Sequence, residues 1–106
     1  MNIEYSEDAK QDLQQIRENL NAFNQSGDDF FDKALIFNRK LSESPKIGAS
    51  LQTKTEAITD FRYRVFPFTK KQIYIIIYRV DEKGNTVYIN RVFDGRMNYL
   101  NVLFGD

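Results

Sequence analysis

The nine residues Gln72–Val80, QIYIIIYRV, form the most apolar stretch of the chain and constrain its fold more than any other feature. A run of this length that is rich in isoleucine and tyrosine predicts a β-strand at the centre of a sheet. The polar residues that follow include Gly84 and predict a hairpin loop, which makes Thr86–Phe93 the partner strand. Upstream, Phe61–Phe68 predicts a third strand, in which Pro67 belongs at an edge or a bulge.

Two amphipathic helices are predicted before these strands. Ser6 suits the N-cap of the first helix, because its hydroxyl can accept from a backbone N–H that has no helical partner. The apolar residues of this helix recur at spacings of three and four and form one stripe: Ala9, Leu13, Ile16, Leu20 and Phe23. Asp28 and Asp29 open the second helix, whose stripe runs over 30–41 before Pro45 ends it. Neither helix can bury its stripe alone, so the pair predicts an antiparallel hairpin packed on a sheet.

The remaining segments complete the predicted order of elements. Asn2–Tyr5 alternates polar and apolar residues and predicts a short strand ahead of the first helix. Residues 46–60 are polar without a lasting period and predict a long loop with room for one turn of helix or strand. Residues 97–104 have the length of a short helix. The predicted fold is α+β over residues 1–106, a single domain, in the order β-α-α-β-β-β.

Composition narrows the class of protein. A chain of 106 residues fits one compact domain, and nine Phe and six Tyr supply a core. The sequence has no cysteine, which removes disulfides and thiolate chemistry and fits a reducing cytoplasm. No basic stretch followed by an apolar run marks a secretory signal, and no apolar run is long enough to span a membrane. We therefore expect a cytoplasmic protein with no membrane partner.

Charge is balanced in total and divided along the chain. The formal net charge is zero, which argues against non-specific nucleic-acid binding by the whole surface. Residues 1–32 carry eight acids against two bases, a net of −6, and residues 33–106 carry thirteen bases against seven acids, a net of +6. The simplest interpretation is two solvated faces that attract each other, although the basic part could steer an acidic partner or contact RNA locally.

Five stretches, taken in order, resemble the RelE/ParE superfamily of bacterial type II toxins. They read YSEDAKQDLQQI at 5–16, SPKIG at 44–48, RYRVFPF at 62–68, YIIIYRV at 74–80 and RVFDGRMN at 91–98. The third and fourth are similar to strands of the ParE branch. The resemblance implies a helical hairpin packed on a small, mainly antiparallel, twisted sheet, and a co-expressed antitoxin. ParE-like members poison DNA gyrase, whereas RelE-like members cleave mRNA in the ribosomal A site.

RNA cleavage through the 2′-hydroxyl needs a base, an acid and cations that stabilise the transition state. The chain has no histidine, and Asp94 stands where the family's closing pattern usually has one. Ile75 and Asn98 also replace an arginine and an aspartate of the nuclease pattern. A carboxylate facing the scissile phosphate is unfavourable unless cations surround it. If the chain is a nuclease, the candidate catalytic residues are Lys54, Arg62, Arg64, Arg79, Arg91, Asp94, Arg96 and Tyr99.

Gyrase poisoning needs a binding surface and no catalytic set, so the sequence favours a ParE-like inhibitor. The candidate target-binding residues are Arg62, Arg64, Arg79, Arg91 and Arg96. The alternatives are a RelE-like ribosome-dependent mRNA interferase, with ribosome and mRNA as its target, and a non-toxic ParE-like binding protein. No metal-ligand spacing, phosphate loop or nucleophile motif is present, so we expect neither a metal nor a cofactor.

Structural roles compete with these assignments. Arg62 and Arg64 share one face of a strand by alternation, and such pairs are often only solvated or salt-bridged to helix acids. Arg79 and Arg91 fall on the parity of the apolar residues around them, Ile75, Ile77, Ile89 and Phe93. Their structural role would be to pair with Asp81 or Asp94. Tyrosines in the strands are expected in core and cross-strand packing: Tyr63, Tyr74, Tyr78 and Tyr88.

The resemblance also implies how the antitoxin binds. In this family a partly disordered antitoxin segment wraps the toxin, across the helical hairpin and along the sheet. We expect an exposed edge strand to form part of that contact, with Arg62 and Arg64 accelerating association electrostatically. At the C-terminal end, Leu100, Val102, Leu103 and Phe104 are expected to fold back on the sheet, and Arg96 is the favoured single contact residue.

Overall fold

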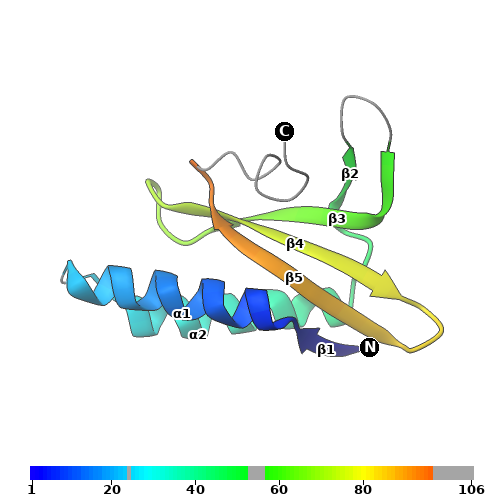
Figure 1. Cartoon of the computed structure of the whole chain (residues 1–106), viewed down its shortest axis with the longest axis horizontal. Coiled ribbons are helices and arrows are strands. Elements are labelled where there is room, and N and C mark those ends of the chain that lie inside the picture. Colours follow the sequence, from blue (N-terminus) through cyan, green and yellow to red (C-terminus); the bar gives the residue numbers. More distant parts are fainter. Residues whose placement is uncertain (24, 53–56, 97–106) are drawn as a thin grey trace.

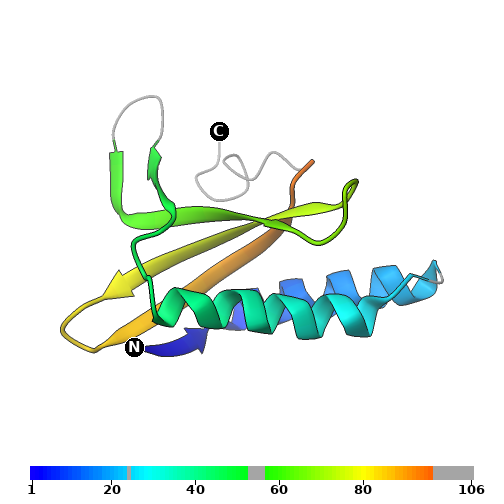
Figure 2. The ribbon, with the colours of Figure 1, turned by 180° about the vertical axis from the view of Figure 1, so that it is seen from behind.

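The computed structural model describes residues 1–23, 25–52 and 57–96, and in them two helices lie on one face of a five-stranded sheet (Figure 1). The helices are α1 (Glu7–Ala22) and α2 (Gly27–Arg39), followed by the 3-10 turn η1 (Lys40–Ser42). The strands are β1 (Asn2–Tyr5), β2 (Ala49–Gln52), β3 (Ala57–Pro67), β4 (Ile73–Asp81) and β5 (Thr86–Asp94). The view from behind places α2 in front of α1, with both helices running along the same side of the sheet (Figure 2).

The sheet has the order β1-β5-β4-β3-β2, with β4 at its centre as the apolar run predicts. Three of its four strand pairs are antiparallel, and β1 pairs in parallel with β5, where Ile3 lies opposite Val87. The predicted α+β class and the helical hairpin on a mainly antiparallel sheet are thereby confirmed. No helix among the described residues is long and apolar enough to cross a bilayer.

One strand of the sheet lies where the sequence predicts a loop. The segment 46–60 contains β2, and β3 begins at Ala57, four residues before the predicted start at Phe61. β2 pairs with β3 across an irregularity between Ser50 and Leu51, which interrupts the alternation on which a strand prediction depends. An edge strand of this kind gains its hydrogen bonds from its neighbour and needs no apolar pattern of its own. The helix predicted over 97–104 and the apolar residues expected to fold back there lie outside the described residues.

The core between helices and sheet is built on aromatic contacts. Phe30 of α2 is fully buried, and its ring centroid lies 4.7 Å from that of Tyr74 and 5.5 Å from that of Phe68. The predicted cap of α1 is confirmed, since the Ala9 N–H donates to Ser6 Oγ at 3.0 Å. The apolar stripe of α1 is buried over 9–20, with Ile16 only partly so, but not at its end: Phe23 is 77% exposed, because it lies beyond the last helical residue.

A bulge at Asn90 divides the apolar residues of β5 between the two faces of the sheet. Ile77 lies opposite Arg91 whereas Tyr78 lies opposite Ile89, so Asn90 has no partner on β4. Ile89 therefore belongs to the helix-facing core, and Phe93 belongs to a second buried cluster on the far face, which we define as the face away from the helices. The prediction that Ile89 and Phe93 share a parity is wrong, since a bulge adds one residue and reverses the alternation.

Candidate binding groove

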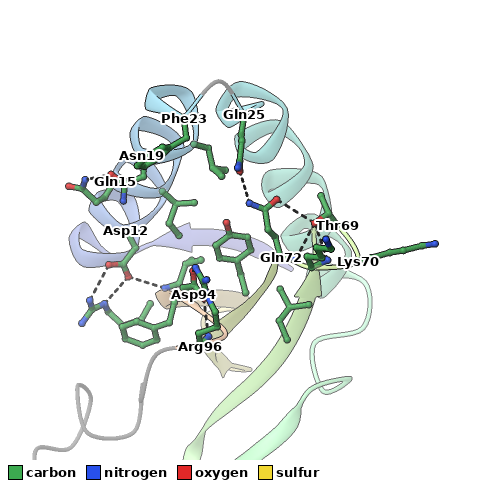
Figure 3. A pocket seen from close by; sticks show the side chains of 18 residues that line it. Asp12, Gln15, Asn19, Phe23, Gln25, Thr69, Lys70, Gln72, Asp94 and Arg96 are labelled. Atoms are coloured by element: carbon green, nitrogen blue, oxygen red, sulfur yellow. Dashed lines mark hydrogen bonds and ion pairs between the residues drawn. The ribbon is translucent and has the colours of Figure 1, made fainter.

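A groove of about 1150 Å³ lies between α1, the β3–β4 turn and the end of β5 (Figure 3). Buried apolar side chains line its inner part: Leu20, Tyr74 and Val92. Exposed cations and apolar groups line its outer part: Lys70, Lys71, Arg96, Phe23 and Ile73. An apolar floor with a polar and cationic rim is the usual composition of a protein-binding site.

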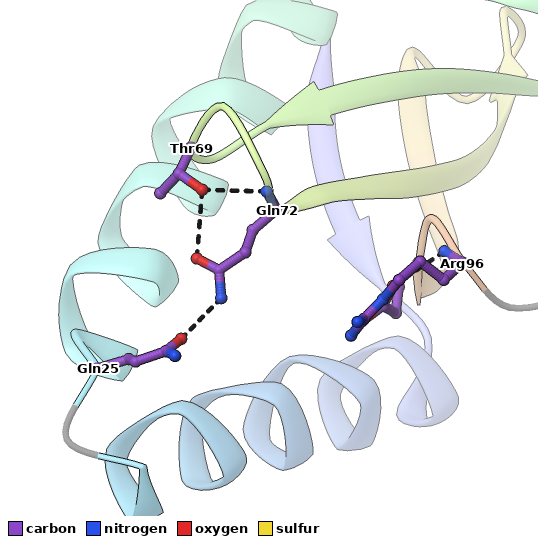
Figure 4. Close-up of polar contacts among 5 residues, drawn as sticks. Gln25, Thr69, Gln72 and Arg96 are labelled. Atoms are coloured by element: carbon purple, nitrogen blue, oxygen red, sulfur yellow. Dashed lines mark hydrogen bonds and ion pairs between the residues drawn. The ribbon is translucent and has the colours of Figure 1, made fainter.

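One end of the groove is closed by a chain of side-chain hydrogen bonds. Gln72 Nε2 donates to Gln25 Oε1 at 2.7 Å, which connects the turn after α1 to the β3–β4 turn 47 residues away (Figure 4). Thr69 Oγ1 donates to Gln72 Oε1 at 3.3 Å and accepts the Gln72 backbone N–H at 3.0 Å. This amide bridge fixes the distance between the two turns that form that end of the groove.

At the other end, Asp94 and Arg96 form a local ion pair. Arg96 donates from Nε to Asp94 Oδ1 at 3.1 Å and from a terminal nitrogen to Oδ2 at 2.9 Å, and its backbone N–H donates to Oδ1 at 2.9 Å. These hydrogen bonds lower the pKa of Asp94. Since both carboxylate oxygens are engaged and the ionised form is stabilised, Asp94 is a poor general base. The arginine side chain is 89% exposed, so its outer surface stays accessible to a partner.

The lowered pKa of Asp94 gives a pH-dependent prediction. Arg96 stabilises the charged carboxylate in the folded state, so the contribution of the pair is present above the unfolded pKa of about 3.9 and is lost as the pH falls through the folded value. In the wild-type chain, the Asp94 carboxyl carbon should titrate in NMR spectra with a midpoint below that ordinary value. In the Arg96→Met variant the midpoint should rise towards it. Equal midpoints in the two proteins would contradict the pairing.

Arg91 is held by α1 rather than by Asp81 or Asp94, which corrects the expected partner. Its Nε donates to Asp12 Oδ2 at 2.8 Å and a terminal nitrogen donates to Oδ1 at 3.0 Å. The Val92 N–H also donates to Asp12 Oδ2, at 2.9 Å. The hydrogen bonds from Arg91 to Asp12 raise the pKa of Arg91, and only 25% of its side chain and 16% of that of Asp12 are exposed. Arg91 therefore attaches α1 to β5 and offers little surface to a target.

Arg62 and Arg64 share the helix-facing side of β3, as the alternation predicts, because they lie opposite Tyr78 and Ile76. Neither is salt-bridged to a helix acid among the described residues. Arg62 donates to the Gly48 carbonyl at 2.8 Å and so supports the bend before β2. The guanidinium of Arg64 lies over a phenylalanine ring of α2, 4.4 Å from the ring centroid.

Arg79 completes the set of described arginine candidates and lies apart from the groove. Its guanidinium is 4.4 Å from the ring centroid of Tyr88 on the neighbouring strand, and no ion pair joins it to Asp81 among the described residues. Among the candidate residues that the structure describes, only Arg91, Asp94 and Arg96 line the groove. Lys54 and Tyr99 lie outside the described residues.

The sequence gives little indication of which residues come together to form the groove. Asp12 lies in the first of the five stretches that resemble the family, and this position is the feature of the sequence that could have indicated its contact with Arg91. Gln25 and Gln72 carry no signal, because their contact joins two turns that no periodicity relates. The position of Lys70 and Lys71 in the sequence indicates only a link between two strands.

The helical hairpin, the sheet order and the groove define a RelE/ParE-like α+β protein with a surface suited to binding another macromolecule. A family model described as "ParE toxin of type II toxin-antitoxin system, parDE" matches residues 3–99. The chain belongs to this family, which is the branch that the strand motifs indicate. A search of curated proteins found no match.

Proposed function

We propose that the chain is the toxin of a type II toxin–antitoxin system, that it stops growth by binding DNA gyrase, and that a cognate antitoxin neutralises it. The family match over residues 3–99 carries this proposal. Inhibition by binding is favoured over RNA cleavage because the candidate general base Asp94 is engaged by Arg96, and Arg91 is engaged by Asp12. Catalysis would require these side chains to be available to a substrate.

The groove rim is the surface we assign to the target. Arg96 is 89% exposed there, and Phe23 is 77% exposed on the rim of the same groove. Arginine and aromatic side chains are enriched among residues that dominate binding energy at protein interfaces. Phe23 and Ile73 are both exposed apolar side chains on this rim, and apolar surface bordered by polar residues marks interaction sites.

The test is a supercoiling assay with purified gyrase together with induced expression in cells that lack the antitoxin. The wild-type chain should inhibit gyrase and cause filamentation with DNA-damage signalling. Arg96→Glu should weaken inhibition by about tenfold, as for the loss of one central charged contact. Lys83→Glu makes the same charge change in the distant β4–β5 loop and should inhibit like the wild type. A rapid stop of translation with mRNA cut at codon positions would instead establish the nuclease, and no growth defect would contradict both activities.

A further inference from the structure

Two buried tyrosines of β4 differ in whether their hydroxyls are bonded among the described residues. Tyr74 is 4% exposed and Tyr78 is fully buried, and both belong to the core between helices and sheet. The Tyr78 hydroxyl accepts the Gly48 N–H at 2.8 Å, whereas no described group bonds to the Tyr74 hydroxyl. A buried tyrosine normally finds a partner for its hydroxyl, so the unbonded hydroxyl of Tyr74 calls for an explanation.

The Tyr74 hydroxyl opens into the groove. The described side-chain atoms that are buried without a hydrogen-bond partner belong to Asn38 and Asn90, and the Tyr74 oxygen is not one of them. Since this oxygen has no described partner, it must be accessible, and Tyr74 lines the groove together with Leu20 and Val92. Burial raises the pKa of the hydroxyl, which therefore stays protonated and can donate a hydrogen bond.

The charged groups near this hydroxyl favour an anionic partner. After burial, the Asp94 carboxylate and the Arg96 guanidinium are the next influences on the pKa of the Tyr74 hydroxyl, which places the three groups at one end of the groove. Both carboxylate oxygens of Asp94 are already engaged by Arg96, whose side chain is 89% exposed. A hydroxyl donor beside an accessible guanidinium suits a carboxylate, because a carboxylate only accepts hydrogen bonds.

The rest of the groove is basic and apolar. Its lining carries four bases and two acids, a net charge of +2, and each acid is bonded to an arginine. The excess charge is that of Lys70 and Lys71, which form no ion pair among the described residues. Phe23 and Ile73 add exposed apolar surface to the same groove. The groove therefore suits a segment that carries both carboxylates and apolar side chains.

We infer that the groove binds an acidic, partly apolar segment of the protein that this chain inhibits, and that the Tyr74 hydroxyl and Arg96 bind one carboxylate of that segment. This inference rests on the proposed function, since it assigns a chemistry to the target's contact. Apolar side chains of the segment would cover Phe23 and Ile73, and the two lysines would accelerate its association. DNA phosphates fit the groove less well, because they leave this apolar surface uncovered and the chain has no net charge.

The decisive variant is Tyr74→Phe, which removes the hydroxyl and keeps the ring that packs on Phe30. Because no described group bonds to this hydroxyl, the variant should unfold in urea like the wild type. A loss of stability as large as that of Tyr78→Phe would show that the hydroxyl has a partner within the chain and would overturn the inference. Tyr88→Phe is the matched control, because it removes the same atom from a ring that lies under Arg79 and outside the groove lining.

Inhibition of purified gyrase is the first measurement, taken as the concentration of the chain that halves supercoiling. Tyr74→Phe should raise this concentration about tenfold, the effect of one lost hydrogen bond to a charged group, and Tyr88→Phe should stay within about twofold of the wild type. The double variant Lys70→Glu with Lys71→Glu should slow association with immobilised gyrase at low salt, and less so at high salt. Lys83→Glu, in the distant β4–β5 loop, should associate like the wild type.

The chemistry of the partner is tested by titrating three probes into the isotope-labelled chain. The probes are a short peptide of alternating glutamate and leucine, the same peptide with lysine in place of glutamate, and a short DNA duplex. The acidic peptide should bind most tightly, shift the amides of residues 70–74 and 92–96, and bind Tyr74→Phe less tightly than the wild type. Tighter binding by the lysine peptide or by the duplex, or shifts away from the groove, would overturn the inference.

The gyrase measurement separates the inference from the proposed function. If the wild type inhibits gyrase and Tyr74→Phe inhibits it equally well, the role of the hydroxyl is wrong while the proposed function stands. If the wild type neither inhibits gyrase nor arrests growth, the proposed function fails, and the assignment of the groove to the target fails with it.

Discussion

Replacing Asp12 with alanine is expected to lower the free energy of unfolding by about 2–3 kcal/mol. The carboxylate receives three hydrogen bonds, two from Arg91 and one from the Val92 N–H. Its loss leaves a mostly buried guanidinium and a backbone donor without a partner. The figure is smaller than for a fully buried pair, since a quarter of the Arg91 side chain is exposed. Urea unfolding followed by circular dichroism measures it.

Two controls separate this effect from a general loss of charge on α1. Glu7→Ala removes an acid of the same helix whose pair with Lys10 is highly exposed, and it should change stability by less than about 0.5 kcal/mol. The double variant Asp12→Ala with Arg91→Ala should be less destabilised than the sum of the single variants, because the pair is removed as a unit. Additive effects would show that the two side chains do not interact.

Replacing Gly48 with alanine is expected to destabilise the chain by about 2–4 kcal/mol. A Cβ at this position would lie 2.5 Å from the Tyr63 carbonyl oxygen and 2.5 Å from the Tyr78 hydroxyl, and the first of these is backbone. The Gly48 N–H also donates to the fully buried Tyr78 hydroxyl at 2.8 Å. Relieving the clash therefore moves either β3 or the bend before β2. The measurement is the same urea unfolding experiment.

Gly84→Ala is the matched control for the glycine change. A Cβ there would approach only the side chain of Asp81, which can rotate away, so the stability should change by about 1 kcal/mol or less in either direction. Tyr78→Phe tests the hydrogen bond separately and should cost about 1–2 kcal/mol, because it leaves the Gly48 N–H unpaired. If Gly48→Ala were no more harmful than Gly84→Ala, the close packing at the bend would be contradicted. Gly48 is also the last residue of the family-like stretch SPKIG at 44–48, so this packing gives a physical reason for its glycine.

The predictable part of the fold is the part with long periodic patterns. Both helices and the strands around β4 are indicated by their apolar spacing, and the Ser6 cap forms as its hydroxyl chemistry requires. β2 and the bulge at Asn90 are not predictable in the same way. Each depends on backbone pairing with a neighbouring strand, and such pairing leaves no period in the sequence.

The candidate site is less predictable than the fold, because the role of an arginine depends on the group that its side chain contacts and the sequence does not show that group. Alternation correctly places Arg62 and Arg64 on one face, but it gives no indication of the carbonyl and ring that hold them. For Arg91 the sequence suggests a nearby acid, whereas its partner Asp12 is 79 residues away. Partners that distant are brought together only by the complete topology.

The parallel pairing of β1 with β5 has a consequence for the time at which the protein can fold. Residues 2–5 find their strand partner at 86–89, so a ribosome must have synthesised most of the chain before its first strand can pair. Closing so long a segment is slow compared with forming the helices or the β4–β5 hairpin. A growing chain would therefore hold its helices beside an incomplete sheet until the last strand emerges. We expect the interval between synthesis and the formation of the groove to be set by the pairing of β1 with β5.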